Sequence, residues 1–344
     1  MQDTDKPLLS IIMPFYNNKE LVAEMIDSIL ANSFKNWELL AIDDGSSKET
    51  IEHLNIYKKD KRIRIIKRDI SPKGAQTCRN IGIEKMHGEF AVFFDSDDYI
   101  TPYCLQTRIN IIRKHADLDF IVFPSGTYNE HTFYPNAPKF KYGYGVHKND
   151  ITAFARRELP FIVWNNIYRS DSIKAYQMKW DTNLLSLQDA DFNITAITRG
   201  MKYKYANVRP DYGYRIAYSQ ESVSKKILSE EHFNSHIYAT KKFFKLLQPI
   251  YGHKYDYAVF QGLLCIYNRV FTNGINKAAA LDMAKCIYEY NHIIGLIFKL
   301  QVKLTIILGQ LISARKARQI IMAPYLIMHI RREKVIQNKI KSIL

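Results

Sequence analysis

Two aspartates, Asp95 and Asp97, follow a run of apolar residues and are separated by one serine. Carboxylate oxygens are the ligands that Mg²⁺ and Mn²⁺ prefer, and these ions keep coordination positions open for substrate phosphates. An Asp-x-Asp pair is also common in solvated turns and helix caps, so the pair alone decides little. Its meaning depends on the elements that position it and on the side chains beside it.

The first third of the chain alternates between short apolar runs and stretches with helical periodicity. The apolar runs predict strands buried on both faces, and the periodic stretches predict helices between them. Strands that alternate with helices predict right-handed crossovers and a mostly parallel sheet. We expect strands over residues 8–15, 37–42, 63–66, 90–94 and 119–123, and helices after residue 18, over 48–59 and 74–86, and from residue 101.

Polar residues follow three of the expected strands. The sequence is PFYN at residues 14–17, DDGS at 43–46 and DSDD at 95–98. Ligands of parallel α/β sheets bind outside the carboxyl ends of the strands. The three polar clusters are therefore predicted to converge on one crevice, which favours a metal-binding role for the Asp-x-Asp pair.

Several classes of protein are excluded. The sequence has no GxxxxGK[ST] phosphate loop, which excludes a P-loop nucleotide hydrolase, and no GxGxxG after the first strand, which argues against a dinucleotide dehydrogenase. The four cysteines lie far apart without a CxxC pair, so we expect buried free thiols. An apolar fraction of 47% in 344 residues excludes a disordered chain.

Four motifs resemble those of family 2 glycosyltransferases. They are SIIMPFYN at residues 10–17, AIDDGSS at 41–47, CRNIG at 78–82 and GEFAVFFDSDD at 88–98. A looser resemblance continues to about residue 226, with WNNIYR at 164–169 and LQDADFN at 187–193. The resemblance implies an α/β GT-A fold, which is Rossmann-like and mostly parallel with flanking helices. It also implies a nucleoside-diphosphate sugar as donor, most commonly a UDP-sugar.

Five residues match positions that bind the donor in this family. Pro14 and Tyr16 match positions lining the nucleotide pocket, where Tyr16 would pack against the base; a strand-ending proline beside a half-buried aromatic is the alternative. Asp44 matches the acid that hydrogen-bonds the base, a role compatible with an Asx turn. Arg79, and Lys73 in a less constrained loop, are expected to meet the diphosphate.

The resemblance also implies a metal site and a base. Asp97 is expected to bind Mn²⁺ or Mg²⁺ directly, and Asp95 to contact the donor ribose or the metal and its water shell. Asp98 is expected to cap the next helix. Asp189 matches the family's base, and Asp191 takes that role if the alignment slips by two residues.

A base at this position implies a single displacement. A carboxylate that takes the proton of the acceptor hydroxyl while the nucleoside diphosphate leaves inverts the anomeric configuration. Gln188 stands where a glutamate is common in the family. This departure motivates a second hypothesis, a sugar-nucleotide-binding or scaffold protein whose catalysis is lost.

The acceptor side is less defined. Trp164 is a candidate platform for a sugar ring, with ordinary core as the alternative. Arg169 and Arg215 are candidates for steering a phosphate-bearing acceptor, with ordinary surface arginines as the alternative. Resemblance to bacterial surface-polysaccharide enzymes implies a hydroxyl of a glycan or of a polyprenyl-linked glycan as acceptor.

The chain is expected to comprise three functional segments. Residues 1–125 would form the nucleotide-sugar-binding half of a GT-A domain, and residues 126–226 its acceptor-side half, with an irregular loop region over 126–160. Residues 227–344 would form a basic, all-helical C-terminal region.

The net charge of +15 is concentrated towards the C-terminus. Residues 291–344 hold ten Lys or Arg residues and one acid, Glu333, and residues 292–313 predict a helix with one apolar side. A basic amphipathic tail of this kind is typical of a helix on an anionic membrane surface. A helical cap on the domain and a dimer contact are equal alternatives, and the oligomeric state is open.

The sequence also suggests a location. Lys299, Gln301 and Lys303 interrupt the most apolar stretch, so no ordinary membrane span is expected. The polar N-terminus lacks the form of a signal peptide. We therefore expect a cytoplasmic protein, peripheral to the inner face of the plasma membrane if the tail binds lipid. No nucleic-acid partner is expected, because no known motif accompanies the basic tail; binding through that tail is the third hypothesis.

Overall fold

The computed structural model describes residues 6–136, 142–216, 229–272 and 277–343. They form two compact units. Unit 1 comprises Met1–Gly145, Pro160–Thr182 and Thr195–Ala217, and unit 2 comprises Val146–Leu159, Asn183–Ile194 and Tyr218–Leu344. The expected boundary at residues 226 and 227 lies outside the described residues. The three functional segments stay a prediction.

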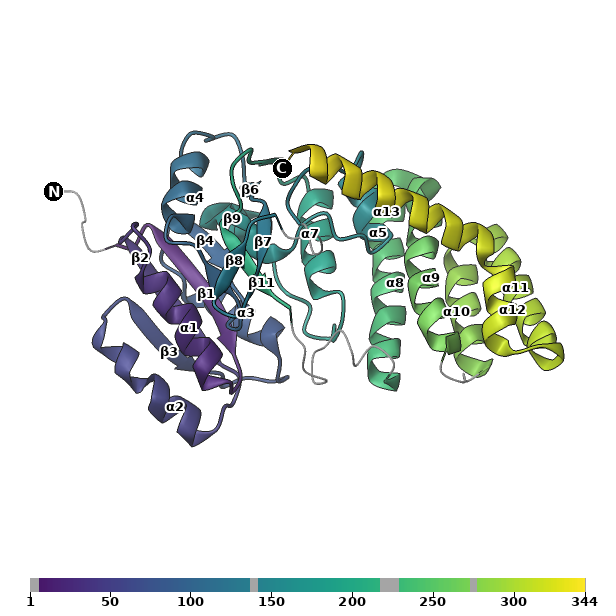
Figure 1. Cartoon of the computed structure of the whole chain (residues 1–344), viewed down its shortest axis with the longest axis horizontal. Coiled ribbons are helices and arrows are strands. Elements are labelled where there is room, and N and C mark those ends of the chain that lie inside the picture. The colour runs from purple at the N-terminus through teal and green to yellow at the C-terminus, as the bar shows by residue number, and fades with distance from the viewer. Residues whose placement is uncertain (1–5, 137–141, 217–228, 273–276, 344) are drawn as a thin grey trace. The chain divides into compact units, whose positions relative to one another are not determined.

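Unit 1 is built on a seven-stranded sheet (Figure 1). The strand order is β10-β6-β9-β4-β1-β2-β3, in which β1 pairs in parallel with both β2 and β4, and β9 runs antiparallel between β4 and β6. All five expected strands are present, and the mostly parallel sheet is confirmed. The strands are β1 (Leu9–Phe15), β2 (Trp37–Asp43), β3 (Ile63–Lys67), β4 (Phe90–Phe93), β6 (Phe120–Val122), β9 (Asn166–Arg169) and β10 (Tyr203–Tyr205).

The helices of unit 1 follow from the same alternation. Every residue of β1 and β2 is buried, as expected of central strands with both faces covered. Helix α3 packs against both strands, and a Cβ at Gly82 would collide with Ile12, so glycine permits this close approach. The helices are α1 (Lys19–Leu30), α2 (Lys48–Leu54) with a 3₁₀ turn over Asn55–Lys59, α3 (Ala75–Lys85), α4 (Cys104–Ile112) and α6 (Ser170–Ala175).

A second, four-stranded sheet in unit 1 was not expected from the sequence. Its order is β5-β11-β7-β8, with β5 (Tyr99–Ile100), β11 (Tyr212–Arg215), β7 (Ser125–Asn129) and β8 (Thr132–Tyr134). Arg108 of α4 and Asp211, which precedes β11, form a fully buried ion pair through two hydrogen bonds of 2.9 and 2.7 Å. Part of the region expected to be irregular is therefore strand, and the small sheet lies beside the DSDD segment.

Unit 2 is helical, which confirms the expected C-terminal region. In Figure 1, α8 to α11 stand side by side and α13 crosses one end of the group. The helices are α5 (Asp150–Ala155), the start of α7 (Gln188–Thr198), α8 (Glu230–Tyr251), α9 (Asp256–Thr272), α10 (Lys277–Tyr290), α11 (His292–Leu311), α12 (Ala314–Ile321) and α13 (Ala323–Ile343). The four cysteines are free, as expected.

Helix α11 bears on the expectation that the chain has no membrane span. Among the described residues it is the one helix long and apolar enough to cross a membrane by length and composition, although only 22% of its most apolar window is buried. Lys299 and Lys303 interrupt the sequence without lowering the mean hydropathy enough to exclude a span.

Candidate functional site

The three polar strand ends meet in unit 1. Strands β4, β1 and β2 are neighbours and run in parallel, so their carboxyl ends lie at one edge of the sheet. Asn17 joins two of them, because its backbone N–H donates to Ser46 Oγ at 2.8 Å and its Oδ1 accepts from Ser47 N at 2.9 Å. The predicted convergence is confirmed.

The end of β1 presents an aromatic ring. Pro14 is buried within the strand, whereas Tyr16 is 49% exposed. Lys73 Nζ lies 3.3 Å from the centroid of the Tyr16 ring, which is a cation–π contact. Two residues expected on the donor side are therefore brought together, with the lysine over one face of the ring.

Asp44, at the end of β2, is held by neighbouring donors. Its Oδ1 accepts from Arg68 Nε at 2.6 Å and from the backbone N–H of Gly74 at 3.0 Å. The Asx turn expected at Asp44 is made by Asp43, whose Oδ1 accepts from Gly45 N and Ser46 N at 3.2 and 2.8 Å. Sequence reasoning missed Arg68, although it directly follows β3 and the strand-end rule points to it.

Arg79, expected at the diphosphate, is buried. Its Nη2 donates to Asp95 Oδ1 at 2.6 Å, and its guanidinium lies 4.4 Å from the Trp180 ring centroid. Asn80, the next residue, exchanges two hydrogen bonds of 2.9 Å with the backbone of Trp180. The start of α3 thus fixes the arginine against one of the two candidate metal ligands.

Asp97 is exposed and lies beside other carboxylates. Removal of water by the surrounding protein, and then the negative charge of Asp95, raise the pKa of Asp97 to about 6. The charges of Arg215 and Arg79 lower the pKa of Asp97 by less than desolvation and the charge of Asp95 raise it.

Asp98 does not cap the following helix, which corrects the expectation. The residue is 1% exposed, and its carboxylate accepts hydrogen bonds of 2.7 Å from Tyr212 Oη and from the backbone N–H of Arg215. Burial raises the pKa of Asp98, and the charges of Asp97 and Asp95 raise it further. Asp98 therefore ties the DSDD segment to β11, and α4 begins without it.

Arg215 is also bonded to the DSDD segment and is not a free surface arginine. Its Nε donates to the Asp97 carbonyl oxygen at 2.7 Å, and its guanidinium pairs with Glu24 of α1. Glu24 also accepts from Tyr128 Oη at 2.6 Å. These bonds hold Arg215 in place, which argues against the steering role expected of it. No pattern in the sequence points to Glu24 or Tyr128.

The two candidate bases lie at the start of α7, in residues assigned to unit 2. Because this segment is helical, Asp189 and Asp191 point in different directions. Asp191 is 2% exposed and accepts from Lys242 Nζ of α8 at 2.8 Å. Asp189 is more exposed than Asp191.

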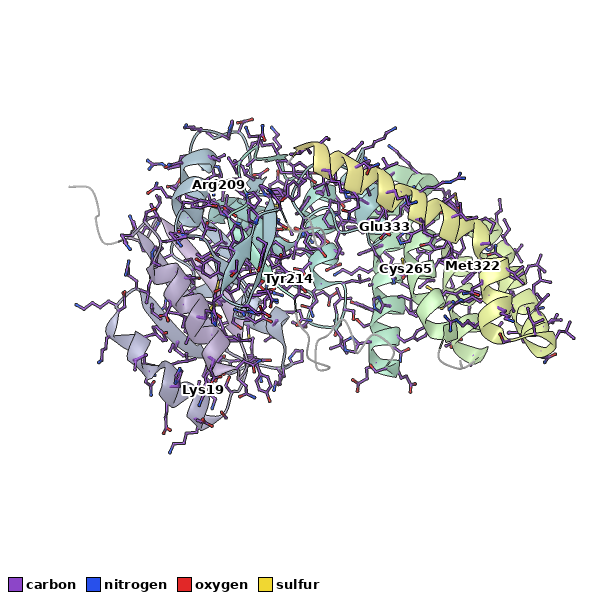
Figure 2. The ribbon with its side chains drawn as sticks, viewed as in Figure 1. Lys19, Arg209, Tyr214, Cys265, Met322 and Glu333 are labelled. Carbon is purple, nitrogen blue, oxygen red and sulfur yellow. The ribbon has the colours of Figure 1, made fainter. Side chains whose placement is uncertain are left out.

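Two acceptor-side candidates are structural. Trp164 is 2% exposed and stacks against Tyr212 and Tyr214, with ring centroids 4.5 and 5.9 Å apart (Figure 2 labels Tyr214). Trp164 is therefore an ordinary core residue, which was the alternative to a sugar platform. Arg169 donates to the carbonyl oxygens of Leu118, Ile112 and His115 at 3.0, 3.2 and 3.2 Å, where α4 gives way to β6. Neither side chain is placed to receive an acceptor.

The family model for glycosyl transferase family 2 matches residues 10–181, which is half of the chain. The chain belongs to glycosyl transferase family 2. The matched residues include β1, β2, β4 and the three polar strand ends of the site.

Relatives agree with this family. An uncharacterised glycosyltransferase of Haemophilus influenzae is 41% identical over 110 residues, which cover 32% of this chain and 44% of that protein. The uncharacterised glycosyltransferase EpsJ of Bacillus subtilis is 28% identical over 205 residues, 58% of each chain. The chain thus spans about half the length of these relatives.

A solved structure extends the likeness to nearly the whole chain. Staphylococcus aureus TarS 1–349, in complex with UDP-GlcNAc, superposes with a TM-score of 0.65 over 92% of this chain and 91% of that one, at 17% identity. This likeness confirms the GT-A fold expected from the motifs.

The family 2 site offers two carboxylates to a divalent metal ion. No cluster of three or more His, Cys, Asp or Glu side chains suited to a metal occurs among the described residues. Mg²⁺ and Mn²⁺ are commonly bound by one or two carboxylates, with water and substrate phosphate as further ligands. Asp95 and Asp97 supply such a pair, separated by one residue at the end of β4. The donor set therefore fits Mg²⁺ or Mn²⁺.

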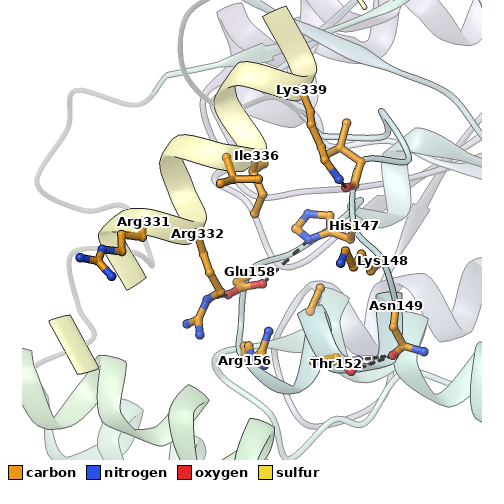
Figure 3. A pocket seen from close by; sticks show the side chains of 13 residues that line it. His147, Lys148, Asn149, Thr152, Arg156, Glu158, Arg331, Arg332, Ile336 and Lys339 are labelled. Carbon is orange, nitrogen blue, oxygen red and sulfur yellow. Dashed lines mark hydrogen bonds and ion pairs between the residues drawn. The ribbon is translucent and has the colours of Figure 1, made fainter. Parts of the chain in front are cut away.

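A pocket in unit 2 lies outside the motifs of family 2. It has a volume of about 380 Å³ and lies between α13 and the segment that carries α5 (Figure 3). Within it, Glu158 pairs with Arg332 at 3.0 Å and with His147 at 3.9 Å. Burial lowers the pKa of His147. Lys148, Arg156, Arg331 and Lys339 also line the pocket, so its lining carries more positive than negative charge.

Proposed function

We propose that the chain transfers a sugar from a nucleoside-diphosphate sugar, a UDP-sugar, to a hydroxyl of a glycan or lipid-linked glycan in bacterial cell-surface polysaccharide synthesis. The observation that carries this proposal is the meeting of an exposed Tyr16, Asp44 and the Asp95/Asp97 pair at three adjacent parallel strand ends. Membership of family 2 supports the reaction class. The UDP-GlcNAc bound in the TarS structure supports the donor class.

Tyr16 and Lys73 are proposed to contact two parts of the donor, one after the other. The exposed ring of Tyr16 stacks on the base, and Lys73 leaves the ring face when the base arrives. The displaced ammonium then interacts with the diphosphate, where a cation forms charge-assisted hydrogen bonds. Asp44 offers the base its Oδ2, because Arg68 and Gly74 use Oδ1.

Asp97 and Asp95 would hold Mn²⁺ or Mg²⁺. When bound there, such a cation would supply charge neutralisation for the leaving diphosphate. Arg79, held against Asp95, keeps that carboxylate oriented towards the strand end.

Asp189 is proposed as the base. It takes the proton of the acceptor hydroxyl as that oxygen attacks the anomeric carbon, and the bond from that carbon to the nucleoside diphosphate breaks in the same step. Attack opposite the leaving group inverts the configuration. Asp191 is excluded from this role in the proposal because Lys242 holds its carboxylate in a buried position.

The donor site is tested by calorimetric titration. The purified chain is titrated with UDP, GDP and dTDP, each with Mn²⁺ and with EDTA. We expect binding of UDP with Mn²⁺ that is lost with EDTA and in Asp97→Asn. The matched control is Asp117→Asn, which removes one exposed carboxylate elsewhere in unit 1 and should bind as the wild type does. A folded wild-type chain that binds none of the three nucleotides contradicts the proposal.

The base is tested by comparing Asp189→Asn with Asp191→Asn. We expect Asp189→Asn to keep UDP affinity and to lose sugar transfer, and hydrolysis of the UDP-sugar, by a factor of roughly 10²–10⁴. Asp191→Asn should instead lower the thermal midpoint, because Lys242 loses its ion-pair partner. If the wild type binds UDP but turns over no sugar with any acceptor, the binding-protein hypothesis motivated by Gln188 replaces this one.

A further inference from the structure

Helix α11 has one face that packs inside unit 2. Gly295, Phe298, Val302 and Thr305 are buried on this face. Phe298 meets two rings of α9 edge-on, Phe260 at 5.1 Å and Tyr267 at 5.2 Å between centroids. A Cβ at Gly295 would collide with the backbone of α10, so α11 lies directly against that helix. This face fixes α11 on the side of the helical group.

The opposite face of α11 is also apolar, although it is exposed. Seven large aliphatic side chains on it are between 39% and 79% exposed. At about 100° per residue they fall within an arc of roughly 100°, centred away from the buried residues. We call this face the α11 stripe, and it consists of Ile293, Leu296, Ile297, Leu300, Leu304, Ile307 and Leu311.

Such a face needs a partner. The outward side of a helix on a water-soluble protein is normally charged or polar. A continuous row of exposed aliphatic side chains marks a protein contact or a membrane contact. The described residues provide no cover for the stripe, as the exposure of its members shows.

The charges beside the stripe select between these partners. Lys299 and Lys303 lie on α11 at one border of the stripe, and both are exposed. Arg315 and Lys316, also exposed, begin α12, which packs against α11. A second copy of this helix would bring these cations against their own counterparts. An anionic lipid surface would neutralise them, with each cation near the headgroups contributing about 1 kcal/mol.

The buried face decides between lying on the bilayer and crossing it. A crossing α11 would have to leave α9 and α10 or take α10 into the hydrocarbon with it. Helix α10 carries Asp282, Lys285 and Glu289, whose charges are costly at the bilayer centre. A helix that lies in the interface keeps its packing and buries only the stripe.

We propose that α11 lies flat on an anionic membrane surface, with the α11 stripe inserted at the boundary between headgroups and acyl chains. Because the cytoplasmic leaflet is the anionic one, the chain would sit at the inner face of the plasma membrane. This inference rests on α11 and its neighbours alone, and it stands or falls separately from the proposed sugar transfer.

Vesicle flotation tests the stripe. Wild-type chain is mixed with vesicles of phosphatidylglycerol and phosphatidylethanolamine, and in parallel with phosphatidylcholine vesicles. We expect the wild type to bind the anionic vesicles. Ile297→Glu/Leu300→Glu removes two inserted side chains and should bind them at least roughly a hundredfold more weakly. The matched control is Ile56→Glu/Ile250→Glu, which makes the same chemical change at side chains 58% and 55% exposed and should bind as the wild type does.

A second variant tests the charges without touching the stripe. Lys299→Gln/Lys303→Gln should lower binding to anionic vesicles by roughly fivefold for each lysine removed, and should leave the weaker binding to phosphatidylcholine unchanged. Added salt should have the same selective effect.

Three outcomes would overturn the proposal. The first is that the stripe variant, shown to be folded by circular dichroism, binds vesicles as well as the wild type does. The second is that the wild type binds no vesicles and forms a dimer, whereas the stripe variant is a monomer; a second copy would then be the partner. The third is that vesicle-bound protein resists extraction at alkaline pH, which would identify a spanning helix.

Discussion

Tyr16 and Lys73 form the contact at the residue scale that bears most directly on donor binding. The Tyr16 ring is the large exposed aromatic surface at the end of β1, and stacking of one base on such a ring contributes about 1–3 kcal/mol. We therefore expect Tyr16→Leu to weaken UDP binding by roughly tenfold or more. Calorimetry measures this, and Tyr134→Leu, at a tyrosine 47% exposed on β8, is the control.

Lys73 gives a different prediction, because the proposal has it contact the Tyr16 ring before the donor binds and the diphosphate afterwards. Lys73→Met should reduce the affinity for UDP by about tenfold, since a charge-assisted hydrogen bond is lost. The affinity for uridine should not fall, because the base no longer displaces an ammonium group from the Tyr16 ring. Equal losses for UDP and uridine would show that Lys73 contacts the base.

Glu24 gives a prediction about stability and pH. Burial alone would raise the pKa of Glu24, but the hydrogen bond from Tyr128 and the charge of Arg215 outweigh it and lower the pKa below the ordinary 4.5. The stabilisation is therefore fully present above about pH 4.5, the value in the unfolded chain, and is lost as the pH falls through the lower folded value.

Glu24→Gln should reduce the free energy of unfolding by about 1–2 kcal/mol at pH 7. The difference from the wild type should shrink as the pH falls below 4.5. Urea unfolding at several pH values measures both. Glu20→Gln on the same helix, whose side chain is 73% exposed, should show neither effect.

At the scale of elements, the packing of α3 on β1 positions Arg79 and Asn80. Because a Cβ at Gly82 would collide with Ile12, Gly82→Ala should force α3 away from the sheet and reduce the free energy of unfolding by about 1–3 kcal/mol. It should also weaken UDP binding, since Arg79 moves with the helix. Glu84→Ala, at an exposed position of α3, should change stability by less than about 0.5 kcal/mol. A stabilised Gly82→Ala would contradict the packing argument.

The elements that sequence predicted are those whose pattern is local. Strands β1, β2 and β4 are continuous apolar runs with polar ends, and parallel crossovers follow from the helices between them. Strand β9 escaped prediction because its four residues pair with β4 and β6, which lie far away in sequence. The small sheet escaped for the same reason, since β11 joins β5 and β7 across about a hundred residues.

The same contrast between local patterns and long-range contacts applies to the candidate site. Tyr16, Asp44, Asp95 and Asp97 were found because they end strands. The partners that fix them were not, because Glu24 is one more acid on an amphipathic helix until the fold brings Arg215 to it. Trp164 shows the converse, since a motif position suggested a sugar platform where distant tyrosines make it core.

At the scale of the whole molecule, the donor residues belong to unit 1 and the basic helices to unit 2. UDP with Mn²⁺ should therefore slow amide hydrogen exchange at the ends of β1, β2 and β4 and leave α9 to α12 unchanged. Mass spectrometry of proteolytic fragments measures this, with EDTA as the control. Protection confined to α9 to α12 would place nucleotide binding elsewhere.

The division of the chain between the two units limits how the molecule can be taken apart. The backbone passes from one unit to the other after residues 145, 159, 182, 194 and 217. Helix α5 packs on α9, and Phe154 on it is fully buried, so a version shortened to residues 1–217 would expose that face. Swapping in the N-terminal half of a relative would likewise cut the chain within these alternating segments. Changes of donor preference in this chain are therefore better sought by local replacement of loops than by exchange of halves.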